Sequence, residues 1–243
     1  MAESILSLSG VRADIDQYHI LHGVDLEVPA GELTVLLGRN GAGKSTTLRT
    51  IMGLTTVTDG KVRFRGEDIT GQPTPRIARK GIAFVPENMG IFSLLTVREN
   101  MVLAAVDGPM DPARLDWVFD LFPPLKKFWN RAAGNLSGGQ KQMLAIARAI
   151  IEPRELLLVD EPTKGLAPAI INDLAGAFEQ LKQQQVTVLL VEQNFNFSRR
   201  LGQSAAVMND GGVVWSGQMT ELADNDDLQH ELLGLGLGLG EHQ

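Results

Sequence analysis

Near the start of the chain, apolar and polar positions first alternate and then give way to a continuous apolar run. Residues 5–11 (ILSLSGV) and 20–28 (ILHGVDLEV) show the alternation of half-buried antiparallel strands, with Gly10 and Gly23 as local breaks. Residues 33–38 (LTVLLG) are apolar throughout, which is typical of a strand covered on both faces, and they lead into glycines and a helix. The pattern predicts a small antiparallel sheet followed by a strand, a loop and a helix.

The rest of the chain predicts alternating strands and helices. A turn is expected at Asp59 and Gly60, and residues 82–87 (IAFVPE) supply a strand that ends at Pro86. The later elements are expected as a helix over 138–151, a strand over 155–160, a helix after Pro168, a strand over 186–192 and short strands around 205–209 and 212–217. This order predicts an α/β fold with a mainly parallel sheet wrapped by helices.

A block with helical periodicity lies between the two halves, over residues 96–135. Thr96 and Asp111 fit N-cap positions, and Pro123 begins an interruption. The block predicts a helical subdomain, which reaches about 88–150 with the motif that follows, inside one domain over 1–240. Residues 232–243 alternate leucine and glycine, and we expect them to be flexible or bound to a partner because such a repeat loses much entropy on ordering.

Composition narrows the class of protein. With 243 residues and 44% hydrophobic content, the chain can bury a sizeable core. It has no cysteine, which excludes disulfides and thiolate metal sites, and no run of about 18 apolar residues that would span a bilayer. No basic region of a secretory signal precedes the first strand. The formal net charge of −7 argues against nucleic acid as a partner.

Residues 38–46 (GRNGAGKST) match the phosphate-binding pattern G-x-x-x-x-G-K-[ST]. Backbone N–H groups of such a loop and the start of the next helix form an anion site. We expect Lys44 to reach the β and γ phosphates, Ser45 to bind Mg²⁺ and Thr46 to lie near the α phosphate. ATP and Mg²⁺ are thus the predicted ligands of Gly38, Arg39, Asn40, Gly41, Ala42, Gly43, Lys44, Ser45 and Thr46. The alternative, an incidental glycine-rich turn, does not explain the strand before it or the helix after it.

Two acids follow the apolar run ELLLV. Asp160 ends a buried strand, where an ATPase of this kind places the carboxylate that binds Mg²⁺. Glu161 comes next and suits a base or an orienting group for the attacking water. The alternative is that both acids cap the following turn, and the phosphate-binding loop weakens it.

A second helix start with anion-binding character lies at residues 136–140 (LSGGQ). Ser137 fits an N-cap, and two glycines open a helix with an apolar stripe. One chain has no need of two phosphate sites for one reaction, so this helix end is expected to serve the nucleotide of a neighbouring copy. An ordinary capped helix is the alternative.

These three motifs, GRNGAGKST, LSGGQ and LLLVDEP in this order, resemble those of the ATP-binding cassette family across nearly the whole chain. The resemblance implies a P-loop NTPase cassette with an N-terminal antiparallel β subdomain and an inserted α-helical subdomain. It also implies that two cassettes, as a homodimer or a heterodimer, enclose two ATP molecules head to tail. The residues that would then contact the γ phosphate held by the other subunit are Ser137, Gly138, Gly139 and Gln140.

The sequence departs from the family pattern at several places. Glu87 stands where the family usually has a glutamine, and its carboxylate can still bind Mg²⁺ or water. Gln193 stands at the place of the switch histidine, and its amide can donate to the γ phosphate without a positive charge. Both are expected in the catalytic set with Lys44 and Glu161. Ala167 replaces a dimer-contact aspartate.

Loss of that aspartate leaves Lys164 and Gly165 to make the contact between subunits. Ile15 occupies the position of the ring that stacks on adenine, and Tyr18 is the candidate replacement, with a surface tyrosine as the alternative. Stacking of this kind contributes about 1 kcal/mol.

The segments VPE, VEQN, GLAP and LLGRNGAGKSTTL resemble the branch that powers uptake of branched-chain amino acids, urea and related small amides. They are similar to the second of that system's two ATPases. This implies an ATPase bound to the cytoplasmic face of a bacterial membrane through permease subunits, and indirectly to a solute-binding protein. Residues 87–93 are expected near the permease, and residues 89–92 (MGIF) either grip a permease helix or pack in the core.

Two other functions remain as alternatives. A soluble cassette ATPase that acts on DNA or ribosomes usually fuses two cassettes or carries a long coiled coil, and the chain shows neither, nor a basic patch. A small-molecule kinase or a GTPase also begins with a phosphate-binding loop, but the LSGGQ segment has no purpose in such an enzyme.

Overall fold

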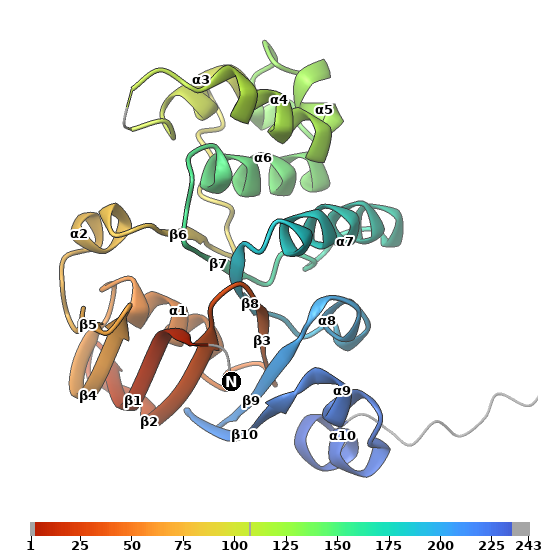
Figure 1. Cartoon of the computed structure of the whole chain (residues 1–243). Helices are drawn as coiled ribbons and strands as arrows, with labels where there is room; N and C mark the ends of the chain where they lie inside the picture. The colour runs from red at the N-terminus through yellow and green to blue at the C-terminus, as the bar shows by residue number, and fades with distance from the viewer. Residues whose placement is uncertain (1–2, 107, 235–243) are drawn as a thin grey trace, which may run out of the picture.

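The computed structural model describes residues 3–106 and 108–234, in which the strands form two sheets (Figure 1). The first is antiparallel and has the strand order β2-β1-β4-β5. Its strands are β1 (Ser4–Ile15), β2 (Tyr18–Pro29), β4 (Thr56–Phe64) and β5 (Glu67–Asp68). The antiparallel subdomain predicted from the alternating pattern is therefore present.

The second sheet has the order β10-β9-β3-β8-β7-β6. Its strands are β3 (Leu33–Gly38), β6 (Ile82–Val85), β7 (Leu156–Asp160), β8 (Thr187–Val191), β9 (Ser204–Asn209) and β10 (Gly212–Gln218). Neighbouring strands run parallel except β10, which pairs antiparallel with β9. The mainly parallel sheet expected from the alternation of strands and helices is confirmed.

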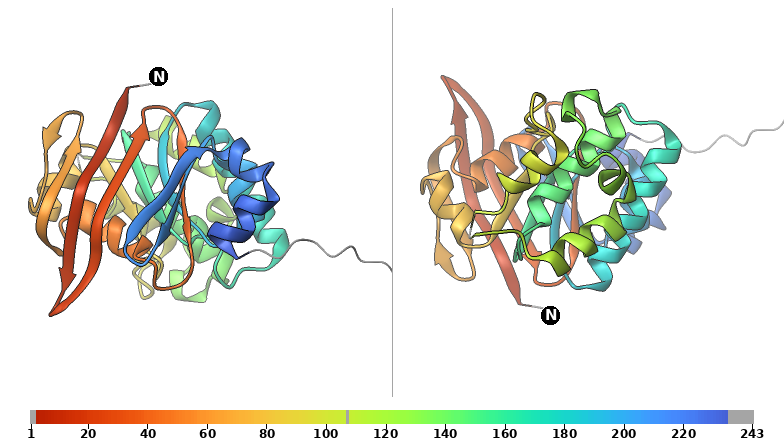
Figure 2. Two further views of the ribbon diagram at one scale, coloured as in Figure 1. Left: turned by 90° about the horizontal axis from the view of Figure 1, so that it is seen from below. Right: turned by 90° about the horizontal axis from the view of Figure 1, so that it is seen from above.

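Helices cover the parallel sheet and form a separate layer at one end of the molecule. In the described residues they are α1 (Lys44–Ile51), α2 (Thr74–Arg79), α3 (Val97–Val102), α4 (Pro112–Leu121), α5 (Pro123–Lys127), α6 (Gly138–Ile150), α7 (Pro168–Gln183), α8 (Phe195–Leu201), α9 (Met219–Ala223) and α10 (Asp226–Leu233), with a 3₁₀ turn at Ala133–Asn135. Figure 1 shows α3, α4 and α5 stacked on α6, away from the antiparallel sheet. Figure 2 shows that sheet on one side of the molecule and α9 and α10 on the other.

The caps expected in the helical block are present. Thr96 caps α3 in a capping box with Glu99, and the Asp111 carboxylate accepts from the Ala113 N–H at the start of α4. Pro123 opens α5 directly after Phe122 ends α4, because a proline is tolerated only in the first turn of a helix. The helical block thus begins with two short helices, each of which has a side-chain cap at its N-terminus.

Two hydrophobic clusters lie on the two faces of the parallel sheet. Val35 and Leu37 of β3 face the cluster shared with α6 and α7, while Leu36 faces the cluster shared with the antiparallel sheet. Every residue of β3, β7 and β8 is buried as a result. The carboxyl ends of these three strands are held at one edge of the sheet, where the candidate functional residues follow.

The turn predicted at Asp59 and Gly60 is wrong. Strand β4 runs through both residues, and its register with β1 shifts at a bulge between Ser9 and Arg12. A Cβ atom on Gly60 would lie 2.4 Å from the Gly10 carbonyl oxygen, so this glycine is required by close strand approach. The chain reverses instead at Arg65, whose φ is 52°, and the next glycine.

Gly10 and Gly23 do not end their strands either, because β1 and β2 continue through them with shifts in register. The predicted leucine and glycine tail begins inside α10, and its residues 235–243 lie outside the described residues. Of the helices that the structure describes, none has the length and apolar character needed to cross a bilayer.

Candidate functional site

The phosphate-binding loop leaves the buried end of β3 and enters α1 at Lys44. Gly38 and Gly43 have φ values of 148° and 101°. A Cβ atom on Gly38 would lie 2.4 Å from the Met208 carbonyl oxygen of β9, so a larger residue would push the loop away from the sheet. Glycines at both ends therefore maintain the shape of the loop. The N-terminus of α1, which carries the positive end of the helix dipole, points at the space above the loop.

Lys44 is buried, and its Nζ donates to the carbonyl oxygens of Gly38 at 2.9 Å and Arg39 at 3.1 Å. The same ammonium lies 3.5 Å from Oε1 of Glu161. Its charge is thus held at the centre of the loop by backbone oxygens, next to the acid expected to act on water.

A pocket of about 350 Å³ opens above the loop. It is lined by Ile20, Asn40, Gly41, Gly43, Lys44, Ser45, Thr46, Glu87, Glu161 and Lys164. Six of the nine predicted residues of the phosphate-binding loop and two of the predicted acids therefore share one cavity. Its cations and loop N–H groups suit a phosphate chain.

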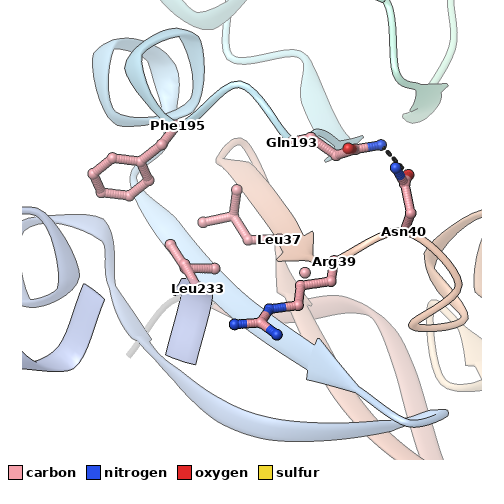
Figure 3. Close-up of a pocket in the computed structure, with 7 residues that line it drawn as sticks. Leu37, Arg39, Asn40, Gln193, Phe195 and Leu233 are labelled. Carbon is pink, nitrogen blue, oxygen red and sulfur yellow. Dashed lines mark hydrogen bonds between the residues drawn. The ribbon is translucent and has the colours of Figure 1, made fainter. Parts of the chain in front are cut away.

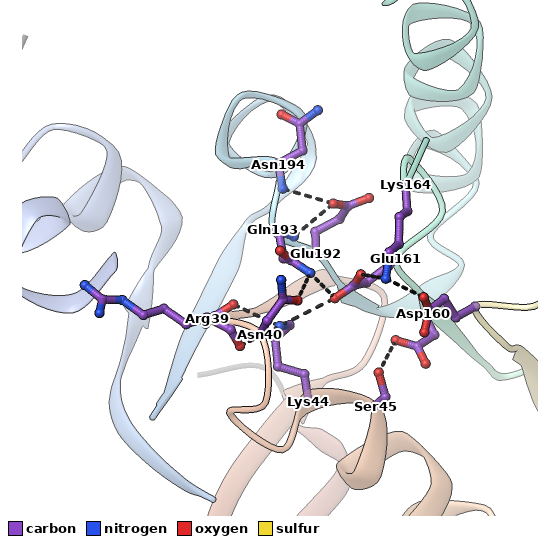
Figure 4. A network of polar contacts seen from close by, with 12 residues as sticks. Arg39, Asn40, Lys44, Ser45, Asp160, Glu161, Lys164, Glu192, Gln193 and Asn194 are labelled. Carbon is purple, nitrogen blue, oxygen red and sulfur yellow. Dashed lines mark hydrogen bonds and ion pairs between the residues drawn. The ribbon is translucent and has the colours of Figure 1, made fainter. Parts of the chain in front are cut away.

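Ser45 and Asp160 face each other, as expected for a magnesium site. The Ser45 hydroxyl donates to Oδ1 of Asp160 at 2.9 Å (Figure 4). Burial raises the pKa of the Asp160 carboxyl to about 6, and the hydrogen bond from Ser45 opposes that rise. A divalent cation between these two oxygen donors would stabilise the charged carboxylate, so the residues present fit Mg²⁺.

Glu161 follows β7 in a left-handed conformation, with φ at 45°, which is uncommon for a residue other than glycine. Its N–H donates to the Val191 carbonyl of β8, and its carboxylate is 8% exposed. Besides Lys44, the carboxylate has Lys164 at 3.6 Å and the Gln193 amide at 2.6 Å. This acid is thus held by groups from α1, from its own loop and from the end of β8 with the residues after it.

Glu87 lines the pocket, and Gln193 contacts two residues that line it. Nε2 of Gln193 donates to Oε1 of Glu161 and to Oδ1 of Asn40, each at 2.6 Å. Glu87 follows β6 and forms an ion pair with Lys164 at 2.5 Å. Lys164, expected only as a subunit contact, therefore also joins two carboxylates of the site.

Arg39 and Tyr18, which were both predicted to bind the nucleotide, lie apart from the pocket. The Arg39 side chain points away from Lys44 (Figure 4) and lines a separate cavity with Leu37, Phe195 and Leu233 (Figure 3). Tyr18, the candidate for adenine stacking, opens β2 and is 65% exposed. Ile20, two residues later, lines the pocket in its place.

The LSGGQ residues do not line the pocket of their own chain in the part that the structure describes. Ser137 caps α6, accepting from the Gln140 N–H at 3.3 Å, while Oε1 of Gln140 accepts from the Ser137 N–H at 3.0 Å. The cap occupies a lone pair of the Ser137 hydroxyl and leaves its proton free to donate. Gly139 has a packing role as well, because a Cβ atom there would lie 2.4 Å from Cγ2 of Ile170 on α7.

One buried polar residue close to the site was missed from sequence. Glu192 follows β8 directly and accepts hydrogen bonds from the N–H groups of Thr163 and Gln193. The available signal was a single acid at the end of an otherwise apolar strand.

The absence of a histidine at position 193 gives a prediction about pH. We expect ATP hydrolysis to show no step near pH 6.5 that originates here, since an amide does not titrate. Gln193→His should introduce such a step, measured as the pH profile of kcat from pH 5.5 to 8.5. A step in the original protein that disappears in Gln193→Ala would contradict this expectation.

A family model and the relatives of this chain indicate the same protein family. The model of the ABC transporter family matches residues 21–164. The high-affinity branched-chain amino acid transport ATP-binding protein BraG of Pseudomonas aeruginosa is 41% identical over 95% of this chain and 100% of its own length. The corresponding protein BraF of the same organism is 30% identical, over 96% of this chain and 99% of its own length.

Solved structures agree with the fold. A nucleotide-free ATP-binding cassette from an ABC transporter superposes with a TM-score of 0.81 at 23% identity, covering 97% of this chain and 100% of its own. A bacterial ABC transporter cassette described as dimeric has a TM-score of 0.79 at 26% identity, covering 88% and 98%. From the family match and these relatives, the chain belongs to the ABC transporter family, as one of its ATP-hydrolysing cassettes.

Proposed function

We propose that this cassette energises an importer of branched-chain amino acids or related small amides such as urea. The observation that carries the proposal is the 41% identity to BraG over 95% of the chain, against 30% to BraF. The higher identity to BraG supports the proposal that the chain is a subunit of the BraG type, in the role of the second ATPase expected from the sequence. A permease and, through it, a solute-binding protein would be its partners at the cytoplasmic face of the membrane.

ATP would bind in the pocket above the phosphate-binding loop, and Mg²⁺ would be held by Ser45 and Asp160. Bound Mg²⁺ neutralises charge on the phosphates. Lys44 binds the β and γ phosphates, and Glu161 accepts a proton from, or orients, the attacking water. Gln193 donates its amide towards the γ phosphate while holding Glu161 in place. Glu87 adds a carboxylate at the rim of the site, balanced by Lys164.

A second cassette would complete each site. The capped start of α6 lies outside the pocket of its own chain, and the free hydroxyl proton of Ser137 suits a phosphate oxygen. A head-to-tail pair brings Ser137, Gly138, Gly139 and Gln140 to the nucleotide held by the other subunit. The dimeric cassette among the structural relatives supports this arrangement.

A groove of about 550 Å³ beside the helical subdomain is the proposed docking site for the permease. Phe84, Met89 and Ala104 contribute apolar walls. Arg148 also lines the groove, with its Nε buried and unpaired among the described residues, and burial lowers the pKa of its guanidinium. A cytoplasmic permease helix with an acidic side chain would match this combination of apolar and cationic groups.

Exposed apolar side chains occur in the groove and in a segment that supplies part of its wall. Leu54 lines the groove, and the others belong to residues 92–106, which include the wall residue Ala104, namely Phe92, Leu94, Val102, Leu103 and Val106. Soluble surfaces rarely gather so many large apolar groups unless a partner covers them. Of the MGIF segment, Met89 and Gly90 line the groove, and Met89 and Ile91 both pack partly against the core.

Leu94→Asp should weaken permease binding because Leu94 is 96% exposed and a charge there would be desolvated on docking. We expect about a tenfold loss of copurification with the permease, a change of the size that 1.4 kcal/mol produces. Val214→Asp is the matched control, since Val214 is another exposed apolar residue but lies on β10, at the opposite edge of the sheet from β6. Equal copurification of the two variants would contradict this docking surface.

The transported solute is tested in lipid with the assembled importer. ATPase activity should rise when the solute-binding protein is loaded with leucine, isoleucine, valine or a small amide. No stimulation by any of these solutes would overturn the proposed substrate class. Activity that is unchanged by the permease would favour the soluble cassette ATPase instead.

A further inference from the structure

We propose that Glu192 is a positioning residue for ATP hydrolysis, which holds the loop after Glu161 and the loop that carries Gln193 in one fixed relation. Glu192 directly follows the last residue of β8 and is only 2% exposed. It takes no part in the nucleotide pocket as described above. Burying a carboxylate costs free energy unless hydrogen bonds or a charged partner compensate it. The contacts that compensate Glu192 therefore indicate what the residue does.

Its hydrogen-bond partners come from two loops, and they are backbone N–H groups together with the Thr163 side chain. Oε1 accepts from the Thr163 N–H at 3.0 Å. Oε2 accepts from the Gln193 N–H at 3.0 Å and from the Asn194 N–H at 3.1 Å (Figure 4). No ion pair to Glu192 occurs among residues 3–106 and 108–234. Three N–H groups converge on two oxygens that can only accept, which matches an ionised carboxylate and no other side chain of this length.

These contacts close a ring around the catalytic acid. From Glu161 the chain passes through Pro162 to Thr163, whose N–H donates a hydrogen bond to the Glu192 carboxylate. Gln193 follows Glu192 in the chain, and its side-chain amide donates back to the Glu161 carboxylate at 2.6 Å. The Glu161 N–H also donates a hydrogen bond to the Val191 carbonyl oxygen at 2.9 Å, which ties the acid to β8. The relative position of the Gln193 amide and the Glu161 carboxylate is therefore set by Glu192.

The ring matters because hydrolysis depends on the direction of the Glu161 carboxylate. A displacement of about 1 Å in a catalytic group can cost on the order of 100-fold in rate. Lys44 and the phosphate-binding loop lie outside the ring and are anchored to β3 by their own hydrogen bonds. Loss of Glu192 should therefore change the chemical step and leave nucleotide binding in place.

Glu192→Gln is the first test, measured on basal ATP hydrolysis by the purified full-length protein. The variant keeps the size of the side chain but turns one acceptor into a donor that faces an N–H group. We expect kcat to fall by on the order of 10- to 100-fold, with the KM for Mg²⁺-ATP within about twofold of the original value. A parallel rise in KM, or an unchanged kcat, would overturn the proposal.

A double-mutant cycle with Gln193→Ala separates positioning from general support of the fold. If Glu192 acts through the Gln193 amide, Glu192→Gln should cost less than about threefold in kcat in the Gln193→Ala background. An equal loss in both backgrounds would show that the residue supports the fold alone. Melting temperatures of all four proteins are compared in parallel.

Glu192→Asp keeps the inference testable if the glutamine variant does not fold. The shorter carboxylate retains its charge and can still accept from the Gln193 and Asn194 N–H groups, but loses reach to Thr163. We expect a kcat between those of the original protein and Glu192→Gln, and a kcat equal to the original would contradict the ring. Because no permease or solute is present, these results do not depend on whether the proposed import function is correct.

Discussion

Glu161→Gln is expected to lower the kcat of ATP hydrolysis by on the order of 10²- to 10⁴-fold while ATP still binds. The amide is isosteric with the carboxylate but cannot accept a proton from water. Its surroundings remain, since Lys44 and Gln193 are held by other contacts as well. Phosphate release in a single turnover measures the loss, and gel filtration with ATP should show a trapped dimer.

The control for that experiment is Glu155→Gln, which removes one carboxylate from an exposed ion pair with Arg65. Exposed ion pairs contribute about 0 to 1 kcal/mol, so this variant should hydrolyse ATP at nearly the original rate. A Glu161→Gln protein that stays monomeric with ATP and hydrolyses it normally would remove Glu161 from its proposed role.

Lys44→Met should raise the Kd for ATP by about 10- to 100-fold, because a hydrogen bond to a charged group contributes about 1.5 to 3 kcal/mol. The ammonium is buried at the centre of the loop, where water cannot replace it. Methionine preserves the length of the side chain and so limits collapse of the loop. Titration of the purified protein with ATP, followed by calorimetry, measures the change.

Lys164→Met is the matched control, since Lys164 also lines the pocket but its side chain is 57% exposed. We expect its Kd for ATP to change less than about threefold, because exposed charges are screened by solvent. An unchanged Kd in Lys44→Met, or an equal rise in both variants, would contradict a specific contact between Lys44 and the phosphates.

The hydrophobic pattern was sufficient to predict most of the sheet. Residues 33–38, 155–160 and 186–192 are nearly continuous apolar runs, and a strand buried on both faces permits few other residues. The motifs that follow these runs could be placed together because parallel strands end at a common edge. The close approach of Ser45 to Asp160, 115 residues apart, follows from that rule.

Features set by contacts distant in sequence could not be predicted. The pair Asp59 and Gly60 has the local signature of a turn, but its conformation is decided by the backbone of Gly10 on the neighbouring strand. Glu192 was missed because its partners are backbone N–H groups, which every residue except proline carries and which leave no pattern in a sequence. The packing role of Gly139 likewise depends on Ile170 of another helix.

The segment that follows β6 belongs to two cavities. Pro86, Asn88 and Met89 line the docking groove, whereas Glu87 between them lines the nucleotide pocket. If a permease binds in this proposed docking groove, its contacts and the nucleotide pocket are joined at adjacent residues, so transmission between them needs no long series of intermediate residues. New permease partners could then evolve through the neighbours of Glu87 while position 87 itself keeps its place in the chemistry.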